Sequence, residues 1–230
     1  MSSTLKKIWK NEYVKTGIMI ALIIVIVFGF WAGSQIVLNT PYPVLAVASG
    51  SMCKLQYMYC DGWSHPFEKT LHFGDLIIVQ GINAKEVKTG FDPQGDVIVF
   101  HRPQSSPASV DELIVHRAVE NETLNGLVYF RTKGDGSSGY STDNWPQDYR
   151  GADYSFNGMI SEKVIVGRVI MRIPWIGHIA LLMHNSNAGV FIVVVLVIVL
   201  ILVEFIIPIL TGKSDENVPK SEFEKPKDKT

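Results

Sequence analysis

The sequence predicts a mainly β domain that faces away from the cytoplasm and is anchored by two transmembrane helices. Three observations support this prediction. An apolar run lies near each end of the chain, and between these runs short β-branched segments alternate with turn-forming residues. An apolar helix of roughly 20 residues crosses the hydrocarbon core of a bilayer. Residues 17–38 and 189–210 both have that length, whereas no sustained helical period stands out between Thr40 and Arg172.

The first apolar run could also be the core of a cleavable signal peptide. Such cores are usually shorter, and a cleavage site with small residues follows them. Residues 17–38 form a run longer than such a core and contain no charged residue. The segment that follows contains the small-residue motif Ser49-Gly50-Ser51-Met52, a candidate functional turn of the mature protein, so we expect an uncleaved anchor.

Lysines at both ends of the chain set the predicted orientation. They are concentrated in residues 1–16 and 211–230, and positive charge favours the cytoplasmic side. We therefore expect a two-pass protein of the cell membrane, with residues 39–185 outside the cytoplasm. The tail 211–230 is charged and poor in large apolar residues, so we expect it to be disordered.

The middle of the chain reads as strands joined by turns and loops. Three stretches are expected to be loops, namely 53–70, 102–111 and 134–158. Residues 172–184 are either an interfacial segment or a strand followed by the start of the final helix. The expected strands are the short β-branched runs: 44–47, 76–79, 97–100, 113–115, 127–130 and 164–166.

The charge and the cysteines limit the partners and cofactors that we expect. The formal net charge is −1, so nothing indicates a nucleic-acid partner. Cys53 and Cys60 both lie in the outward domain, where thiols tend to oxidise, and we expect a local disulfide. The alternative is a zinc site with His65 and His72, although structural zinc sites usually have cysteines closer in sequence. We expect no metal.

Three segments contain side chains that can carry chemistry. Ser49-Gly50-Ser51-Met52 is a turn of small residues that can expose a hydroxyl. His116 directly follows an apolar strand run, and imidazole is the side chain best suited to activate a hydroxyl near neutral pH. Asp135 and Asp143 lie in one loop, and a carboxylate can orient such a histidine. Each also has an ordinary interpretation, as a surface turn, a structural histidine or a turn aspartate. We expect structural roles for the other histidines: His65, His72, His101, His178 and His184.

Taken in order after an N-terminal anchor, these segments resemble the type I signal peptidases. The resemblance extends roughly from Pro43 to Gly177, plus the first span. In the common bacterial enzymes the base is a lysine, and His116 at that place is similar to the archaeal and endoplasmic-reticulum branch. The segments that carry the resemblance are: 49–52, 74–79, 95–100, 113–119, 131–143 and 166–177.

The resemblance implies roles for individual residues. Ser51 is the implied nucleophile, and His116 its base. Asp143 is the implied orienting acid, and Asp135 a second important carboxylate. The Ser49 hydroxyl and the backbone N–H of Ser51 are implied to form the oxyanion hole. No cofactor is implied. The implied substrates are secretory precursors with small residues at the cleavage site, and membrane lipid and the secretion translocon are further expected partners.

The chain departs from the family pattern at two places. Cys53-Lys54-Leu55 stands where the family has an acidic residue or Met and then Pro, and extra residues separate Asp135 from Asp143. We favour Asp143 as the carboxylate that contacts His116. The alternative function is a noncatalytic membrane-anchored β-domain for binding or assembly. A second alternative is a peptidase for a specialised, pilin-like precursor.

Overall fold

The computed structural model describes residues 12–54, 60, 70–109, 111–185 and 195. The chain divides into two compact units, 1–182 and 183–230. Nearly all the described residues belong to the first unit, which contains the first predicted span and most of the predicted β domain.

The first predicted span is helical. Helix α2 (Glu12–Val37) is apolar, and its large side chains between Ile18 and Phe30 are exposed. A helix that is apolar all round fits a lipid environment. Within the described residues, Gly17–Val37 is the one helical stretch long and apolar enough to cross a membrane. The second predicted span, 189–210, lies outside the described residues apart from residue 195, so a two-helix anchor is not shown.

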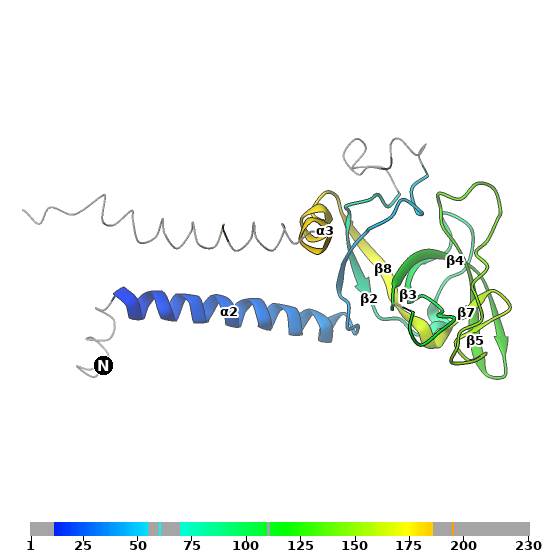
Figure 1. The fold of residues 1–230 in the computed structure, drawn as a ribbon, viewed down its shortest axis with the longest axis horizontal. Coiled ribbons are helices and arrows are strands. Elements are labelled where there is room, and N and C mark those ends of the chain that lie inside the picture. The colour runs from blue at the N-terminus through cyan, green and yellow to red at the C-terminus, as the bar shows by residue number, and fades with distance from the viewer. Residues whose placement is uncertain (1–11, 55–59, 61–69, 110, 186–194, 196–230) are drawn as a thin grey trace, which may run out of the picture. The chain divides into compact units, whose positions relative to one another are not determined.

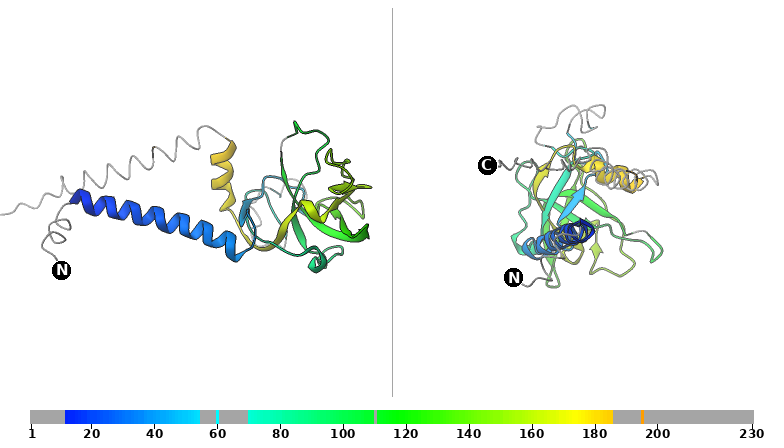
Figure 2. Two further views of the ribbon diagram at one scale, coloured as in Figure 1. Left: turned by 90° about the horizontal axis from the view of Figure 1, so that it is seen from below. Right: turned by 90° about the vertical axis from the view of Figure 1, so that its left-hand side faces the viewer.

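The rest of the described chain is mainly β. Its strands form one antiparallel sheet in the order β1-β2-β8-β3-β4-β5-β7-β6, curled into a half-barrel (Figures 1 and 2). Helices are short: two single 3₁₀ turns, η2 (Ala84–Glu86) and η3 (Glu162–Val164), and α3 (Gly177–Asn185). The strands are: β1 Val44–Ala46, β2 Leu76–Gln80, β3 Val97–His101, β4 Leu113–Leu124, β5 Leu127–Lys133, β6 Ser155–Phe156, β7 Met159–Ser161 and β8 Ile165–Ile173.

All six predicted strands occur, and two further strands were not predicted. The prediction of a loop over 134–158 was wrong at its end, where β6 forms a hairpin with β7. Asn157 and Gly158 both have positive φ, 49° and 74°, which suits the tight turn of a two-residue hairpin. Strands of two or three residues are too short to show an alternation of apolar and polar side chains. The Asn-Gly pair was therefore the available sequence signal for this hairpin. After β8 the chain continues into α3, as one of the two alternatives for 172–184 had it.

The core has two clusters, one on each face of β3. Ile98 and Phe100 belong to the first cluster, while Val99 belongs to the second. This division arises from the strand itself, because successive side chains point to opposite faces. The second cluster also contains Met52, which directly follows the candidate nucleophile. The position of Ser51 is therefore tied to the packing of the core.

Candidate active site

Ser51 lies in a tight turn a few residues after β1. The N–H of Cys53 donates to the carbonyl of Gly50 at 3.0 Å, which closes the turn around Ser51. Met52 and Cys53 are buried beneath it. Because these side chains anchor the turn, the Ser51 hydroxyl remains near the surface, 3.3 Å from the hydroxyl of Ser49.

His116 lies within β4, opposite Ile98 of β3. Its Nδ1 is 2.6 Å from Oδ2 of Asp143, and both side chains are largely buried. An ionised carboxylate only accepts hydrogen bonds. Nδ1 is therefore assigned as the donor, which leaves the lone pair on Nε2.

Gly134 allows the ring of His116 and the backbone of Ser51 to approach each other. A methyl group at Gly134 would lie 3.2 Å from Nε2 of His116 and 2.6 Å from the carbonyl oxygen of Ser51. Only glycine leaves enough room. The N–H of Gly136 donates to the same carbonyl at 2.8 Å. Nε2 and the nucleophile turn thus pack against the same glycine.

Ser51 and His116 line one cavity of about 280 Å³. One wall of the cavity is the segment 46–49, which continues the edge strand β1, and the other is the start of β4. β4 pairs with β5 only from Arg117 onward. Residues 113–116 therefore pair with β3 alone among the described strands, and their second edge is available. An extended peptide can add to such an edge.

Asp143 reaches His116 because the loop after β5 folds back onto that strand. The N–H of Asp143 donates to the carbonyl of Thr132 at 2.8 Å. The Thr132 hydroxyl in turn lies 2.6 Å from Oδ2 of Asp143 and accepts a hydrogen bond from Nε1 of Trp145 at 2.8 Å. The carboxylate is thus held by both backbone and side-chain contacts.

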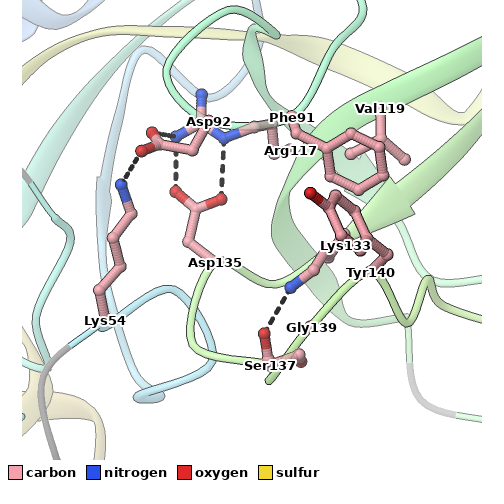
Figure 3. Close-up of a pocket in the computed structure, with 10 residues that line it drawn as sticks. All are labelled: Lys54, Phe91, Asp92, Arg117, Val119, Lys133, Asp135, Ser137, Gly139 and Tyr140. Carbon is pink, nitrogen blue, oxygen red and sulfur yellow. Dashed lines mark hydrogen bonds and ion pairs between the residues drawn. The ribbon is translucent and has the colours of Figure 1, made fainter.

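Asp135 binds Arg117 (Figure 3), whereas the carboxylate at His116 is that of Asp143. The carboxylate of Asp135 accepts hydrogen bonds from Nε of Arg117 at 2.8 Å and from a terminal nitrogen at 2.5 Å. Arg117 also pairs with Asp92 and donates to the carbonyl of Gly95. Burial lowers the pKa of Arg117, but the hydrogen bonds and charge of Asp135, together with the charges of Asp92 and Asp96, raise it by more. The guanidinium therefore remains charged and joins β4 to two loops.

A second cavity, of about 330 Å³, lies beside this ion pair (Figure 3). Lys54 on its wall binds Asp92. The Lys133 ammonium donates to the carbonyls of Gly134 and Ser137. The charged side chains of this cavity are bound to one another or to the backbone, so they hold loops together.

Comparison with known proteins finds relatives of one kind. No family model matches the chain. The signal peptidase complex catalytic subunit SEC11 of Metarhizium acridum is 26% identical over 163 residues, which cover 71% of this chain and 76% of that protein. The subunit SEC11C of Homo sapiens is 25% identical over 182 residues, 79% of this chain and 78% of that protein.

The homologues of this chain are signal peptidase catalytic subunits. The predicted resemblance to the archaeal and endoplasmic-reticulum branch of the type I signal peptidases is thereby confirmed. Asp143 lies against His116 although this chain departs from the signal peptidase pattern in the loop between Asp135 and Asp143.

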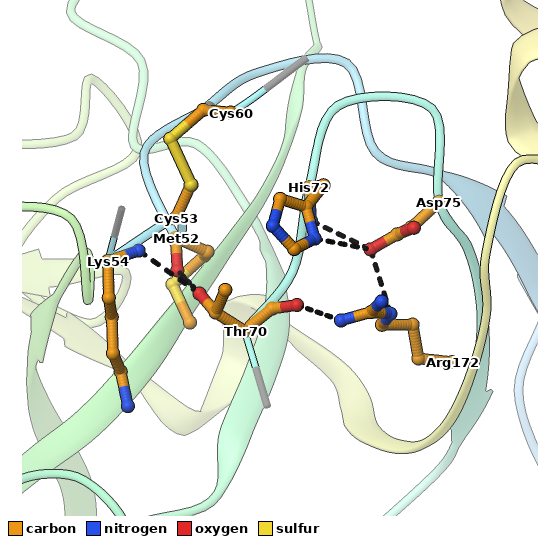
Figure 4. The surroundings of a disulfide bond; sticks show 8 residues. All are labelled: Met52, Cys53, Lys54, Cys60, Thr70, His72, Asp75 and Arg172. Carbon is orange, nitrogen blue, oxygen red and sulfur yellow. Dashed lines mark hydrogen bonds and ion pairs between the residues drawn. A yellow bond between two sulfur atoms is a disulfide. The ribbon is translucent and has the colours of Figure 1, made fainter. Parts of the chain in front are cut away.

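The other departure from the signal peptidase pattern contains a disulfide (Figure 4). Cys53 and Cys60 are bonded, with Cα atoms 5.8 Å apart. This bond uses both thiols that the alternative zinc site requires. His72 is buried nearby, and its backbone N–H donates to the carboxylate of Asp75 at 2.7 Å. His65 lies outside the described residues, and the described part of the chain gathers no group of three or more potential metal ligands.

Sequence reasoning missed three residues that hold the site together. Arg117 and Thr132 lie inside the signal peptidase segments but were given no role. A charged residue directly beside the candidate base was the available signal for Arg117. Trp145 is the one tryptophan in the polar segment 134–158, and a residue that large and apolar signals an anchor in the core. The centroid of its ring lies 5.4 Å from that of Phe100.

Proposed function

We propose that the protein is a membrane-anchored serine endopeptidase that removes signal peptides from secreted precursors. The observation that carries the proposal is the arrangement of Ser51 and His116 in one cavity, with Nδ1 of His116 bound to Asp143. The signal peptidase names of the homologues support the choice of substrate.

The proposed reaction is acyl transfer through Ser51. Nε2 of His116 takes the hydroxyl proton as the Ser51 oxygen attacks the scissile carbonyl, and Asp143 stabilises the imidazolium that forms. The Ser49 hydroxyl and the backbone N–H of Ser51 stabilise the developing oxyanion, and one such donor can be worth roughly 3 kcal/mol. The imidazolium then protonates the leaving amine. Water, activated by the same base, releases the signal peptide from Ser51.

The cavity suits an extended substrate with small side chains. We propose that the peptide lies between segment 46–49 and residues 113–116, where backbone edges face the cavity. Alternate side chains of an extended peptide point the same way. Two of them would therefore enter the cavity, as expected for precursors with small residues at the first and third positions before the cleaved bond.

A membrane anchor would place the enzyme where these precursors emerge. The apolar helix α2 is the proposed span. Large apolar side chains are also exposed near the end of β8 and on α3, including Met171, Trp175 and Ile179, and we propose that they meet the lipid surface. Proximity to the emerging substrate replaces a search through solution. Localisation in the cell membrane with the β domain outside the cytoplasm, and contact with the translocon, belong to this proposal.

Cleavage of a purified preprotein by the full-length protein tests the proposal. We expect a single cut after the signal peptide, identified by N-terminal sequencing of the product. Ser51→Ala should lower the rate by about a thousandfold or more, because the nucleophile and its base act as one unit. Ser105→Ala, on an exposed loop, is the matched control and should keep full activity. A Ser51→Ala enzyme within a few-fold of wild type would refute the mechanism, and a wild-type protein inactive on several precursors would favour the noncatalytic alternative.

A further inference from the structure

We propose that Thr132 and Trp145 are positioning residues that fix the orientation of Asp143 and the tautomer of His116. This inference rests on the proposed function, and it concerns two residues that are not among those lining the cavity. Its basis is a chain of hydrogen bonds that runs from the core to Nδ1 of His116.

The donor at the far end of this chain determines the direction of each bond. The indole of Trp145 can only donate, so the Thr132 hydroxyl must accept its hydrogen bond at 2.8 Å. A hydroxyl has one hydrogen, and the hydroxyl oxygen of Thr132 also lies 2.6 Å from Oδ2 of Asp143. That hydrogen is therefore directed at the carboxylate.

The same carboxylate oxygen also determines which ring nitrogen of His116 carries the proton. Oδ2 of Asp143 receives the Thr132 hydroxyl and also lies 2.6 Å from Nδ1 of His116. With both neighbours donating, the proton of the neutral ring sits on Nδ1 and the lone pair on Nε2. This is the tautomer that can take a proton from Ser51.

Both positioning residues are fixed by their surroundings. Thr132 is 0% exposed on β5. The ring of Trp145 packs edge-on against Phe100 in the core, with centroids 5.4 Å apart, and lies 6.0 Å from the ring of His116. The backbone N–H of Trp145 is bound by the carbonyl of Gly158 at 3.2 Å.

The loop that carries Asp143 is restrained at that aspartate. Residues 136–142 separate Asp135 from Asp143, and holding such a segment in one conformation costs conformational entropy that contacts must offset. Contacts to Thr132 restrain Asp143 at its backbone N–H and its carboxylate. These two contacts thus hold the carboxylate of Asp143 at His116.

Three substitutions separate positioning from packing. Thr132→Val keeps the shape of the side chain and removes the hydroxyl, whereas Thr132→Ser restores the hydroxyl. Trp145→Phe keeps an aromatic ring in the core and removes only the indole donor and part of the ring. Thr123→Val, on an exposed part of β4, is the matched control for a threonine-to-valine change in a strand.

The measurement is the kcat and KM of preprotein cleavage, together with thermal unfolding of each variant. We expect Thr132→Val to lower kcat about tenfold to a hundredfold with little change in KM, because a misplaced base affects the chemical step. Thr132→Ser should recover most of that loss. Trp145→Phe should lower kcat by less than Thr132→Val, and Thr123→Val should match wild type. Proton NMR should also show the low-field Nδ1 hydrogen of His116 weakened or lost in Thr132→Val.

Two results would overturn the inference while leaving the proposed function intact. One is a Thr132→Val enzyme with wild-type kcat when Ser51→Ala is inactive. The other is a loss of kcat in Thr132→Val that Thr132→Ser does not recover. If Thr132→Val fails to fold, Trp145→Phe decides: wild-type kcat with an unchanged Nδ1 resonance overturns the inference, and a lowered kcat supports it. Activity that persists in Ser51→Ala would instead count against the proposed function.

Discussion

At the scale of single residues, Asp135 and Asp143 follow the same strand but meet different partners. The carboxylate of Asp143 meets the imidazole of His116, and that of Asp135 meets the guanidinium of Arg117. A carboxylate beside an imidazole stabilises the charge that forms during proton transfer, whereas one beside a buried guanidinium neutralises a charge that is always present. Replacing Asp135 should therefore affect mainly stability, and replacing Asp143 mainly turnover.

We predict that Asp135→Asn lowers stability and that Asp143→Asn lowers turnover. Arg117 would keep Asp92 and a carbonyl but lose its main counter-charge, at a cost of about 3 kcal/mol, the lower end for a broken buried pair. Asp143→Asn should stay folded and lose up to on the order of 10⁴-fold in kcat. Thermal unfolding and cleavage rates measure both effects, and Asp153→Asn at an exposed ion pair is the control. The prediction would be contradicted if Asp135→Asn were stably folded but inactive while Asp143→Asn stayed fully active. The two aspartates would then have each other's roles.

At the scale of elements, the nucleophile turn is held between β1 and a disulfide. Met52 packs in the core, and the Thr70 hydroxyl donates to the carbonyl of Met52 at 2.5 Å. Cys53, one residue further on, is bonded to Cys60 across a sequence separation of 7. The segment that follows Ser51 is thus restrained by core packing, by a hydrogen bond and by the disulfide (Figure 4).

We predict that the Cys53–Cys60 bond forms in the native protein and stabilises it modestly. A loop this short contributes about 2.5 kcal/mol in the chain-entropy model. The double substitution Cys53→Ser and Cys60→Ser should therefore lower Tm by several degrees, and mass spectrometry of unreduced protein should show no free thiol. Two free thiols in protein purified from an oxidising compartment would contradict the prediction, and stoichiometric zinc would favour the metal site instead.

At the scale of the whole domain, a buried carboxylate joins two loops that are distant in sequence. The carboxylate of Asp148 is completely buried and accepts hydrogen bonds from Arg150 and from the backbone N–H of Gln104. The N–H of Tyr149 donates back to the carbonyl of Gln104 at 2.7 Å. The loop after β3 and the loop after β5 are fastened together in this way.

This junction predicts a loss of stability in acid. Hydrogen bonds from Arg150, together with those from backbone N–H groups, lower the pKa of Asp148 despite its burial. A depressed carboxyl pKa contributes stability that is complete above the unfolded-state value, about 4, and is lost as pH falls through the folded-state value. Asp148→Asn should therefore lower the free energy of unfolding at pH 7, with a difference from wild type that shrinks below about pH 4. Denaturant unfolding at several pH values measures this, and a difference independent of pH would contradict it.

The strand segments and the order of the site motifs could be predicted from the sequence. Runs such as 76–79 and 97–100 are strands because β-branched side chains between turn residues favour extended backbone, which is a local property. The segments that contain Ser51 and His116 could be recognised because each is a short motif of neighbouring residues. The short hairpin β6–β7 escaped prediction because its strands are too short to show alternation, although Asn157-Gly158 marks its turn.

Only the tertiary structure decided which groups meet. The partners of Asp135 and Asp143 depend on the path of a loop, and no local pattern specifies that path. Thr132 and Trp145 gain their roles because the loop returns to β5 and places an indole next to a buried hydroxyl. The sequence by itself thus determined six of the strands, one apolar helix long enough to cross a membrane and the family resemblance, since these depend on neighbouring residues. Contacts between distant residues depend on how the whole sheet closes, and they had to be seen in the structure.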